Sequence, residues 1–296
     1  MLHRQTLAQE TAIEGIGLHS GLRVRLRLVP VEAETGIVFV RTDAGGAVVP
    51  ADLEWAGPCY YATVLSKDGV SVSTIEHLMA ALYALQIDDI RVELDGPEVP
   101  ILDGSSRPFV EAILAAGRRE LPVIRQYLTM IRPVEITEEE KTIAVFPCPE
   151  YRVTYAIGFD HPLLGYQELT ASPWGTEAFA EKLAPARTFV LEREVEALRS
   201  KGLAKGGSLE NAVVLGENGV LNSGLRFPDE FVRHKMLDLT GDLSLLGRPL
   251  RGHVIAYRAG HDLHGKLARR IRQRSDSWYL APWTGEAAAQ KAVAPA

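Results

Sequence analysis

The chain has 296 residues, of which 46% are hydrophobic and 24% charged. At about 150 residues per domain this length predicts two domains, and the ordinary apolar fraction excludes wholesale disorder and low-complexity scaffolds. The chain carries 32 Lys and Arg against 38 Asp and Glu, for a net charge of −6. This acidic balance argues against a nucleic-acid binder, which usually carries a basic surplus.

Signals for targeting and redox chemistry are missing from the sequence. No apolar run reaches the ~18 residues that a membrane span needs, and the first residues lack the apolar region of a secretory signal. The two cysteines, Cys59 and Cys148, indicate neither a disulfide framework nor a thiolate zinc site. We therefore expect a soluble, cytoplasmic protein.

The first third of the chain predicts strands and two helices. Apolar and polar residues alternate or cluster in three predicted strands, at 22–28, 36–41 and 90–94. Residues 75–85 (IEHLMAALYAL) predict a helix that is apolar on most sides and hence largely buried. Residues 108–116 predict a second helix, which begins at a proline and ends before a glycine.

The segment 118–126 is polar, charged and contains a proline, and we place the connection between two domains in it, near residue 122. Beyond it we predict both strands and helices. The predicted strands are 128–131, 142–146, 152–157, 212–215 and 254–257, and the predicted helices are 177–183, 192–201, 229–245 and 263–273. The tail 281–296 is rich in alanine, and we expect it to be disordered.

Each half therefore mixes strands with helices, and its strands form hairpins rather than regular βαβ units. This pattern favours an α+β fold, in which helices cover mostly antiparallel sheets. We assign residues 1–122 to the first domain and residues 127–280 to the second. The sequence shows no convincing repeat between the two halves.

One face of the predicted helix 229–245 carries His234 and Asp238, which lie four residues and so one turn apart. Imidazole nitrogen and carboxylate oxygen both suit zinc. The alternative is an ordinary polar pair on the helix surface, and a metal site would need a third ligand from elsewhere. His77 is the candidate, because an ionisable residue at the start of a buried helix needs a partner.

Glu76, directly before His77, allows two interpretations. A carboxylate beside a zinc ligand can act as the general base for a metal-bound water. Alternatively, Ser73 and Glu76 form a capping box, in which the Glu76 carboxylate accepts a hydrogen bond from the Ser73 amide. Spacing alone does not separate the two.

Other polar residues could complete such a site. His261 follows a predicted strand and is suited to donate a proton near neutral pH, and Asp242 could orient it. His264 could instead form a second metal pair with His261, although this would remove the proton donor. Arg187 and Lys235 could grip a diphosphate.

Several segments, in order along the chain, resemble one family. They are GIGLHSG (15–21), STIEHLMAAL (73–82), DGPEVPILDGSS (95–106), ARTF (186–189), GGSLENAVVL (206–215), GLRFPDEFVRHKMLDLTGDLSLLG (224–247) and GH (260–261). Taken alone, the first of these segments favours a hairpin loop, since its glycine spacing fits neither a P-loop nor a dinucleotide fingerprint. Together the segments resemble the UDP-3-O-acyl-N-acetylglucosamine deacetylases, zinc enzymes of lipid A biosynthesis in Gram-negative bacteria.

The resemblance implies two α+β domains of similar topology, each a sheet with two helices, and an active site between them. It implies hydrolysis of the acetamide of UDP-3-O-[(R)-3-hydroxyacyl]-N-acetylglucosamine to acetate and a free amine, the committed step of lipid A biosynthesis. The implied cofactor is one catalytic Zn²⁺ per chain, with Fe²⁺ as an alternative in the cell. Besides the UDP-linked substrate, the resemblance suggests transient contact with the inner membrane surface, no nucleic acid, and a monomer.

The resemblance also implies roles for single residues. His77, His234 and Asp238 match the zinc ligands, and Glu76 matches the general base. His261 matches the group that protonates the leaving amine, Asp242 matches its carboxylate partner, and Thr188 matches a hydroxyl that polarises the acetyl carbonyl. Positions that match residues holding the sugar nucleotide are His19, Lys141, Phe159, Arg187, Phe189 and Lys235, the last of which we also count as catalytic. Asp160, Asp262 and His264 depart from the residues usual in the family.

An acylated substrate implies an apolar passage beside the zinc, and the segment 187–215 predicts a β-α-β insert that could form it. The predicted helix 192–201 is highly charged, yet one narrow apolar stripe runs along it. The expected lining residues are Leu191, Val195, Leu198, Ala204, Leu209 and Val214. Alternatively, the stripe only packs the helix onto its own strand.

Two other functions stay open from the sequence. One is a metal-dependent hydrolase of a different amide or ester, which would lack the basic residues for a sugar nucleotide. The other is a lipid-binding module, which would lack a ligand or the base. The chain has all of these residues, so the deacetylase remains the favoured interpretation.

Overall fold

The structure is a computed structural model that describes residues 2–32, 34–57 and 61–283. Its helices are α1 (Glu76–Ala84), α2 (Arg107–Ala116), α3 (Thr176–Lys182), α4 (Glu192–Ser200), α5 (Glu230–Ser244) and α6 (His261–Gln273), with short 3-10 helices at Thr42–Ala44 and Ser275–Ser277. Among the described residues, no helix is both long and apolar enough to cross a membrane.

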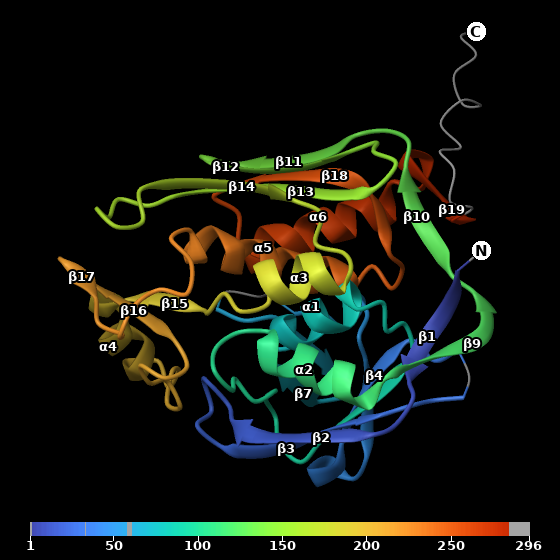
Figure 1. Ribbon diagram of the computed structural model, residues 1–296, viewed down its shortest axis with the longest axis horizontal. Coiled ribbons are helices and arrows are strands. Elements are labelled where there is room, and N and C mark those ends of the chain that lie inside the picture. The colour runs from blue at the N-terminus through green and yellow to red at the C-terminus, as the bar shows by residue number, and fades with distance from the viewer. Residues whose placement is uncertain (1, 33, 58–60, 284–296) are drawn as a thin grey trace, which may run out of the picture.

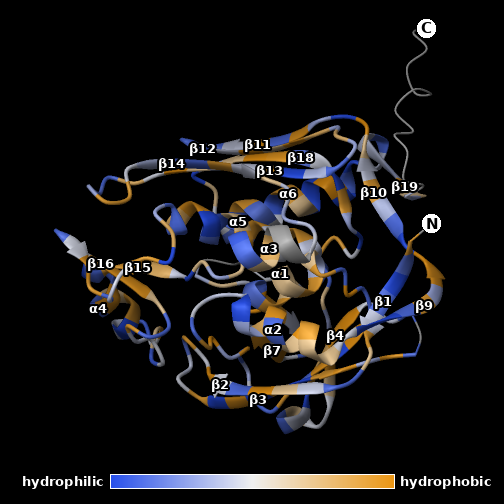
Figure 2. Ribbon diagram, in the orientation of Figure 1, coloured by the Kyte–Doolittle hydropathy of each residue, from blue (hydrophilic) through white to orange (hydrophobic). Residues whose placement is uncertain are grey.

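Two large sheets form the outer layers of the molecule. The first contains, in spatial order, β2 (Thr11–Ile16), β3 (Arg23–Val29), β8 (Ile90–Leu94), β4 (Ile37–Arg41) and β5 (Ala47–Pro50). The second contains β11 (Val134–Glu138), β12 (Lys141–Phe146), β18 (Leu250–Tyr257), β13 (Tyr151–Gly158) and β14 (Tyr166–Ala171), and it continues from one end of β18 into β10 (Gln126–Met130) and β19 (Trp278–Pro282). Figure 2 shows hydrophobic and hydrophilic residues alternating along these strands, as expected for sheets with one buried face.

The remaining strands form three small sheets. They are the ribbon of β1 (His3–Leu7) and β9 (Arg118–Ile124), the hairpin of β6 (Val64–Lys67) and β7 (Val70–Ser73), and the sheet of β15 (Phe189–Leu191), β16 (Val213–Gly216) and β17 (Gly219–Val220). Strands β15 and β16 are parallel and are joined through α4, so the β-α-β insert predicted for 187–215 is present.

The two large sheets share one topology. In the first, β2–β3 and β3–β8 are antiparallel, β8–β4 is parallel and β4–β5 is antiparallel. In the second, β11–β12, β12–β18, β18–β13 and β13–β14 follow the same sequence of directions. The helices also correspond, because α1 and α2 flank β8 in the chain as α5 and α6 flank β18. The predicted α+β fold with two similar halves is confirmed.

The helices lie between the sheets, with α1 against α5 at the centre (Figure 1). Every residue of α1 is buried, which confirms the prediction of a largely buried helix. Gly241 of α5 allows the two helices to approach closely, because a Cβ at this position would come within 2.1 Å of the Glu76 carbonyl oxygen. The first turn of α1 is therefore held against the middle of α5.

We predicted a connection between the two domains in the segment 118–126. In the structure most of this segment is strand β9. Strand β9 pairs with β1, and the register shifts between His3 and Gln5, opposite the region of Pro122. Charged residues and a proline suit the edge of a two-stranded ribbon, where a missing amide leaves no buried carbonyl unpaired. The domain boundary between 122 and 127 stays a prediction.

The predicted disorder of the tail 281–296 is wrong for its first residues. Ala281 and Pro282 belong to β19 and pair with β10. Residues 284–296 lie outside the described part of the chain, so the prediction for them stands as it was.

Candidate active site

Three helix segments meet between the two halves: the first turn of α1, the middle of α5 and the start of α6. His77 and Glu76 come from α1, His234 and Asp238 from α5, and His261 is the first residue of α6. The alternative of an ordinary polar pair on the helix surface is wrong, because His234 and Asp238 are each only 1% exposed.

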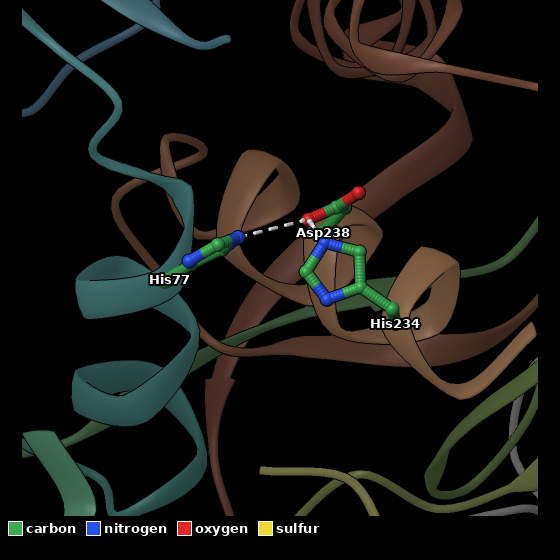
Figure 3. A group of neighbouring side chains, drawn as sticks. All are labelled: His77, His234 and Asp238. Atoms are coloured by element: carbon green, nitrogen blue, oxygen red, sulfur yellow. Dashed lines mark ion pairs between the residues drawn. The ribbon is translucent and has the colours of Figure 1, made fainter. Parts of the chain in front are cut away.

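His77, His234 and Asp238 aim their side chains at one point (Figure 3). The His77 Nε2 atom lies 3.6 Å from Asp238 Oδ1, and the His234 Nε2 atom lies 3.3 Å from the same oxygen. This buried Oδ1 accepts no hydrogen bond from any described residue, an arrangement that is costly unless a further partner binds there. Two imidazole nitrogens and a carboxylate oxygen match the donor set of zinc.

Hydrogen bonding and charge put His234 and Asp238 in the states that a metal ion needs. The His234 Nδ1 atom lies 3.1 Å from the Ala186 carbonyl oxygen, so Nδ1 carries the proton and the Nε2 lone pair is free. Burial lowers the pKa of His234 to about 3. Burial opposes ionisation of Asp238, but neighbouring positive charge, including that of the Lys235 ammonium, holds the pKa of its carboxyl well below the usual value.

Glu76 is placed to act on the same point and not to cap its helix. The Ser73 amide donates to the Pro97 carbonyl oxygen at 3.0 Å, and Ile75 precedes the first helical residue, so the capping-box alternative is wrong. The Glu76 Oε2 atom instead accepts a hydrogen bond from the Thr63 amide at 3.0 Å. Burial raises the pKa of the Glu76 carboxyl, which brings it closer to the range of a general base at neutral pH.

His261 lies on the other side of the group and is held by Asp242. The His261 Nδ1 atom is 2.7 Å from Asp242 Oδ2, and its Nε2 atom is 4.0 Å from Glu76 Oε1 and 3.9 Å from Asp238 Oδ2. Burial by itself would lower the pKa of His261, but Asp242 and the other carboxylates raise it to about 9. The imidazolium form therefore persists at neutral pH and can donate a proton.

Two residues that the sequence did not single out for this role complete the hold on Asp242. The His264 Nδ1 atom lies 2.7 Å from Asp242 Oδ2, and the Thr63 hydroxyl donates to Asp242 Oδ1. The His264 Nε2 atom lies 3.0 Å from the Tyr155 hydroxyl. His264 and His261 thus both bond Asp242, and since both of its oxygens accept hydrogen bonds, we assign this group to positioning rather than to a second metal pair.

Aromatic and cationic side chains line the approach to the group. The Phe189 ring lies 5.9 Å from the Phe159 ring and 6.4 Å from the His234 ring. The Lys235 Nζ atom lies 5.4 Å from the Phe189 ring centre and 3.0 Å from Asp238 Oδ2. Lys141, at the start of β12, is exposed. The roles predicted for these residues in holding the sugar nucleotide stay predictions.

The expectation that Arg187 grips a diphosphate does not fit its contacts. Its guanidinium donates to both carboxylate oxygens of Glu230, at 2.8 and 3.1 Å, and to the Gly224 carbonyl oxygen. Arg187 is 7% exposed and Glu230 is fully buried, and breaking such a pair would leave an uncompensated buried charge. We therefore assign Arg187 to fixing the first turn of α5 next to the segment that carries Thr188.

Arg258 is a cation that the sequence did not reveal. It has a left-handed backbone (φ 53°) just after β18, and its Nε donates to the Gly158 carbonyl oxygen at 2.9 Å, next to Phe159. No motif signals such a residue, because the contact depends on the pairing of β13 with β18.

A cavity of about 390 Å³ lies beside the insert and reaches Thr188. Its lining includes five of the six predicted passage residues, namely Val195, Leu198, Ala204, Leu209 and Val214, together with His19 and Phe189. The prediction of Leu191 is wrong: it is 7% exposed and lines a different cavity with Leu215. Val190, its neighbour in β15, lines the passage in its place.

The apolar stripe of α4 is not packed away against its own strands. No residue of α4 is buried, and Val195 and Leu198 line the cavity. The loop 17–22, which joins β2 to β3 in a hairpin as predicted for GIGLHSG, closes the cavity from the other side with Leu18 and His19. Tyr61, for which no sequence pattern suggested a role, also lines this cavity.

Comparisons with known proteins agree with this arrangement. A family model described as UDP-3-O-acyl N-acetylglycosamine deacetylase matches residues 4–273. A relative named UDP-3-O-acyl-N-acetylglucosamine deacetylase from Syntrophotalea carbinolica is 47% identical over 290 residues, which cover 97% of this chain and 93% of the relative. Relatives with the same name from Myxococcus xanthus (46% identical, covering 95% and 90%) and Shewanella sp. (42% identical, covering 97% and 95%) also match along their length. The chain therefore belongs to the family of UDP-3-O-acyl-N-acetylglucosamine deacetylases.

Proposed function

We propose that the protein hydrolyses the N-acetyl group of UDP-3-O-[(R)-3-hydroxyacyl]-N-acetylglucosamine in lipid A biosynthesis. The observation that carries the proposal is the group His77, His234 and Asp238, with Glu76 on one side, His261 on the other and an apolar cavity alongside. Family membership supports the same substrate, which is the one in the names of the relatives.

We further propose that the group binds one Zn²⁺, with Fe²⁺ as an alternative in the cell. The Asp238 Oδ1 atom, which accepts no hydrogen bond from a described residue, and the neighbouring Nε2 atoms of His77 and His234 suit such an ion. When bound there, the ion would lower the pKa of a water molecule and polarise the acetyl carbonyl.

The protein's own residues divide the remaining chemistry between them. Glu76 takes the proton of the attacking water, since its raised pKa suits a base at neutral pH. His261 gives a proton to the nitrogen of the leaving amine, which is a poor leaving group until it is protonated. The Thr188 hydroxyl and the Lys235 ammonium orient the acetyl group and stabilise negative charge on its oxygen.

The substrate spans two regions of the site. Its acyl chain fits the cavity lined by Val195, Leu198 and Val214, where each buried CH₂ would contribute about 0.8 kcal/mol. Its UDP-sugar lies toward Phe159 and Phe189, within reach of the Lys235 ammonium. A cytoplasmic, monomeric enzyme that contacts the inner membrane transiently remains our expectation.

The direct test is acetate release from the acylated UDP-sugar by purified protein of known metal content. We expect release of acetate and a free amine, loss of turnover after chelation and recovery on adding Zn²⁺. Release of the fatty acid instead of acetate would indicate an esterase. Full turnover of the chelated protein would contradict the metal site.

A further inference from the structure

Glu98 is a buried carboxylate outside the group described above. It is 1% exposed. It lies just after the turn that follows β8, and it forms an isolated parallel bridge with Ser73, the last residue of β7. Among residues 2–32, 34–57 and 61–283, no Lys, Arg or His side chain forms an ion pair with it; its partners are one hydroxyl and two amides. A buried charge without a counter-charge is costly, so its hydrogen bonds must offset a large penalty.

One hydrogen bond of Glu98 leads to the reaction centre. The Thr74 hydroxyl donates to Glu98 Oε1 at 2.8 Å. Thr74 has a left-handed backbone (φ 57°), which is strained for a β-branched residue. It lies two residues before Glu76 and three before His77, so this bond holds the chain at the bend from which α1 begins.

The other hydrogen bonds of Glu98 lead to the mouth of the apolar cavity. The amides of His19 and Ser20 donate to its two oxygens at 2.8 and 2.7 Å. Gly17 faces the same carboxylate so closely that a Cβ would lie 2.3 Å from Glu98 Oε2. Glu98 therefore fixes the hairpin loop 17–22 in one conformation.

That loop is in turn the docking surface of the β-α-β insert. The amides of Lys205 and Gly206 donate to the carbonyl oxygens of His19 and Leu18 at 3.3 and 3.0 Å. A Cβ at Gly206 would lie 2.3 Å from the Gly17 carbonyl oxygen, so the two backbones touch. Figure 1 shows the loop end of the β2–β3 hairpin close to the insert.

We propose that Glu98 is a positioning residue that couples the mouth of the acyl passage to the start of α1. Through Thr74 it sets the position of Glu76 and His77, and through loop 17–22 it sets the position of the insert. One carboxylate therefore holds both elements, each through its own hydrogen bonds. This inference rests on the proposed function and adds to it a residue that touches neither substrate nor metal.

Two variants break the two links separately. Thr74→Val removes the hydroxyl but keeps the shape and the β-branch, so it releases only the start of α1. We expect kcat to fall by about 10- to 100-fold, the scale of a displacement near 1 Å, for long-chain and short-chain substrates alike. Thr74→Ser keeps the hydroxyl, so its kcat should stay near that of the wild type.

Gly17→Ala displaces loop 17–22 from the carboxylate and should act on the passage. We expect KM for a long-chain substrate to rise by about tenfold, with a smaller change for a short-chain analogue and for kcat. Glu98→Gln should combine both effects. Glu93→Gln is the matched control, because Glu93 lies on the same stretch of chain but pairs with Arg27 and Arg91 outside the site.

The experiment combines these kinetics with metal content and amide hydrogen exchange on the metal-loaded enzymes. We expect metal content to stay unchanged and exchange at His19 and Ser20 to quicken in Glu98→Gln but not in Glu93→Gln. Lower thermal stability with unchanged kcat and KM in Thr74→Val and Gly17→Ala would overturn the proposal, as would the same kinetic change in both. If the wild type released no acetate, the proposed function would fail, while the exchange data would still test whether Glu98 holds loop 17–22. If Glu98→Gln did not fold, the comparison of Thr74→Val with Thr74→Ser would decide.

Discussion

Replacing Gly241 by alanine should disable the enzyme although it removes no functional group. In an isolated helix, Gly→Ala is favourable by about 1 kcal/mol. Here the new Cβ would lie 2.1 Å from the Glu76 carbonyl oxygen, 2.9 Å from its carbonyl carbon and 3.1 Å from its Cα. These are backbone atoms that cannot rotate away, so α1 must move off α5 by about 1 Å to restore an ordinary contact distance, a backbone shift of the kind that overpacking causes.

This displacement carries Glu76 and His77 away from the α5 residues His234 and Asp238. A misplacement of about 1 Å can cost on the order of 100-fold in rate, and overpacking typically costs about 1–3 kcal/mol of stability. We expect Gly241→Ala to fold, to melt at a lower temperature and to lose about 100-fold in kcat/KM. Gly265→Ala in α6 is the control, because its Cβ would meet only the Arg269 guanidinium, at 3.4 Å. Wild-type kcat/KM in Gly241→Ala would refute the reasoning that the α1–α5 contact sets the site.

Four further outcomes are expected. Glu76→Ala should keep its metal, measured by elemental analysis, and lose about 10²–10⁴-fold in kcat; a rate near wild type would contradict its role as base. His234→Ala should lose the metal. A chelator should therefore lower the melting temperature of the wild type but leave that of His234→Ala unchanged. The rate should fall as pH rises through about 9, where His261 loses its proton. Asp242→Asn removes the charge that raises this pKa, so the fall in rate should move to lower pH. If the fall stayed at the same pH in this variant, another group would be responsible for it. Val195→Trp should lower kcat/KM far more for a long-chain substrate than for a short-chain one, with unchanged metal content, and an equal loss would show that the cavity is packing space.

Local sequence patterns predicted the elements whose causes are local. The buried helix at 75–85 and the long helix at 229–245 are present as α1 and α5, because their apolar spacing reflects one continuous packing surface. Strand β9 was missed since its edge position tolerates the charges and the proline that mark a connection elsewhere. The capping box failed because a tertiary partner, the Thr63 amide, takes the carboxylate of Glu76.

In the site, too, local sequence patterns predicted some features, whereas contacts between distant segments were missed. The four-residue spacing of His234 and Asp238 is visible in the sequence because both lie on one helix face. The hold of Thr63 on Asp242 joins residues 179 positions apart, and no local pattern contains that information. Leu191 was misassigned for a smaller reason: it is the last residue of β15, directly before α4, and so it does not belong to the helical stripe.

The distribution of charge explains why these distant residues form one unit. Glu76, Asp238 and Asp242 place three carboxylates in a region where each is at most 4% exposed. Among the described residues, the cations that face them are the His261 imidazolium and the Lys235 ammonium. Carboxylates buried with too few cations are costly, and a divalent ion beside Asp238 Oδ1 would supply the missing positive charge. Asp242, which is not among the proposed metal ligands, contributes most to the raised pKa of His261. The three buried carboxylates therefore divide two tasks: Asp238 favours the metal ion, and Asp242 maintains the proton donor that the proposed reaction requires.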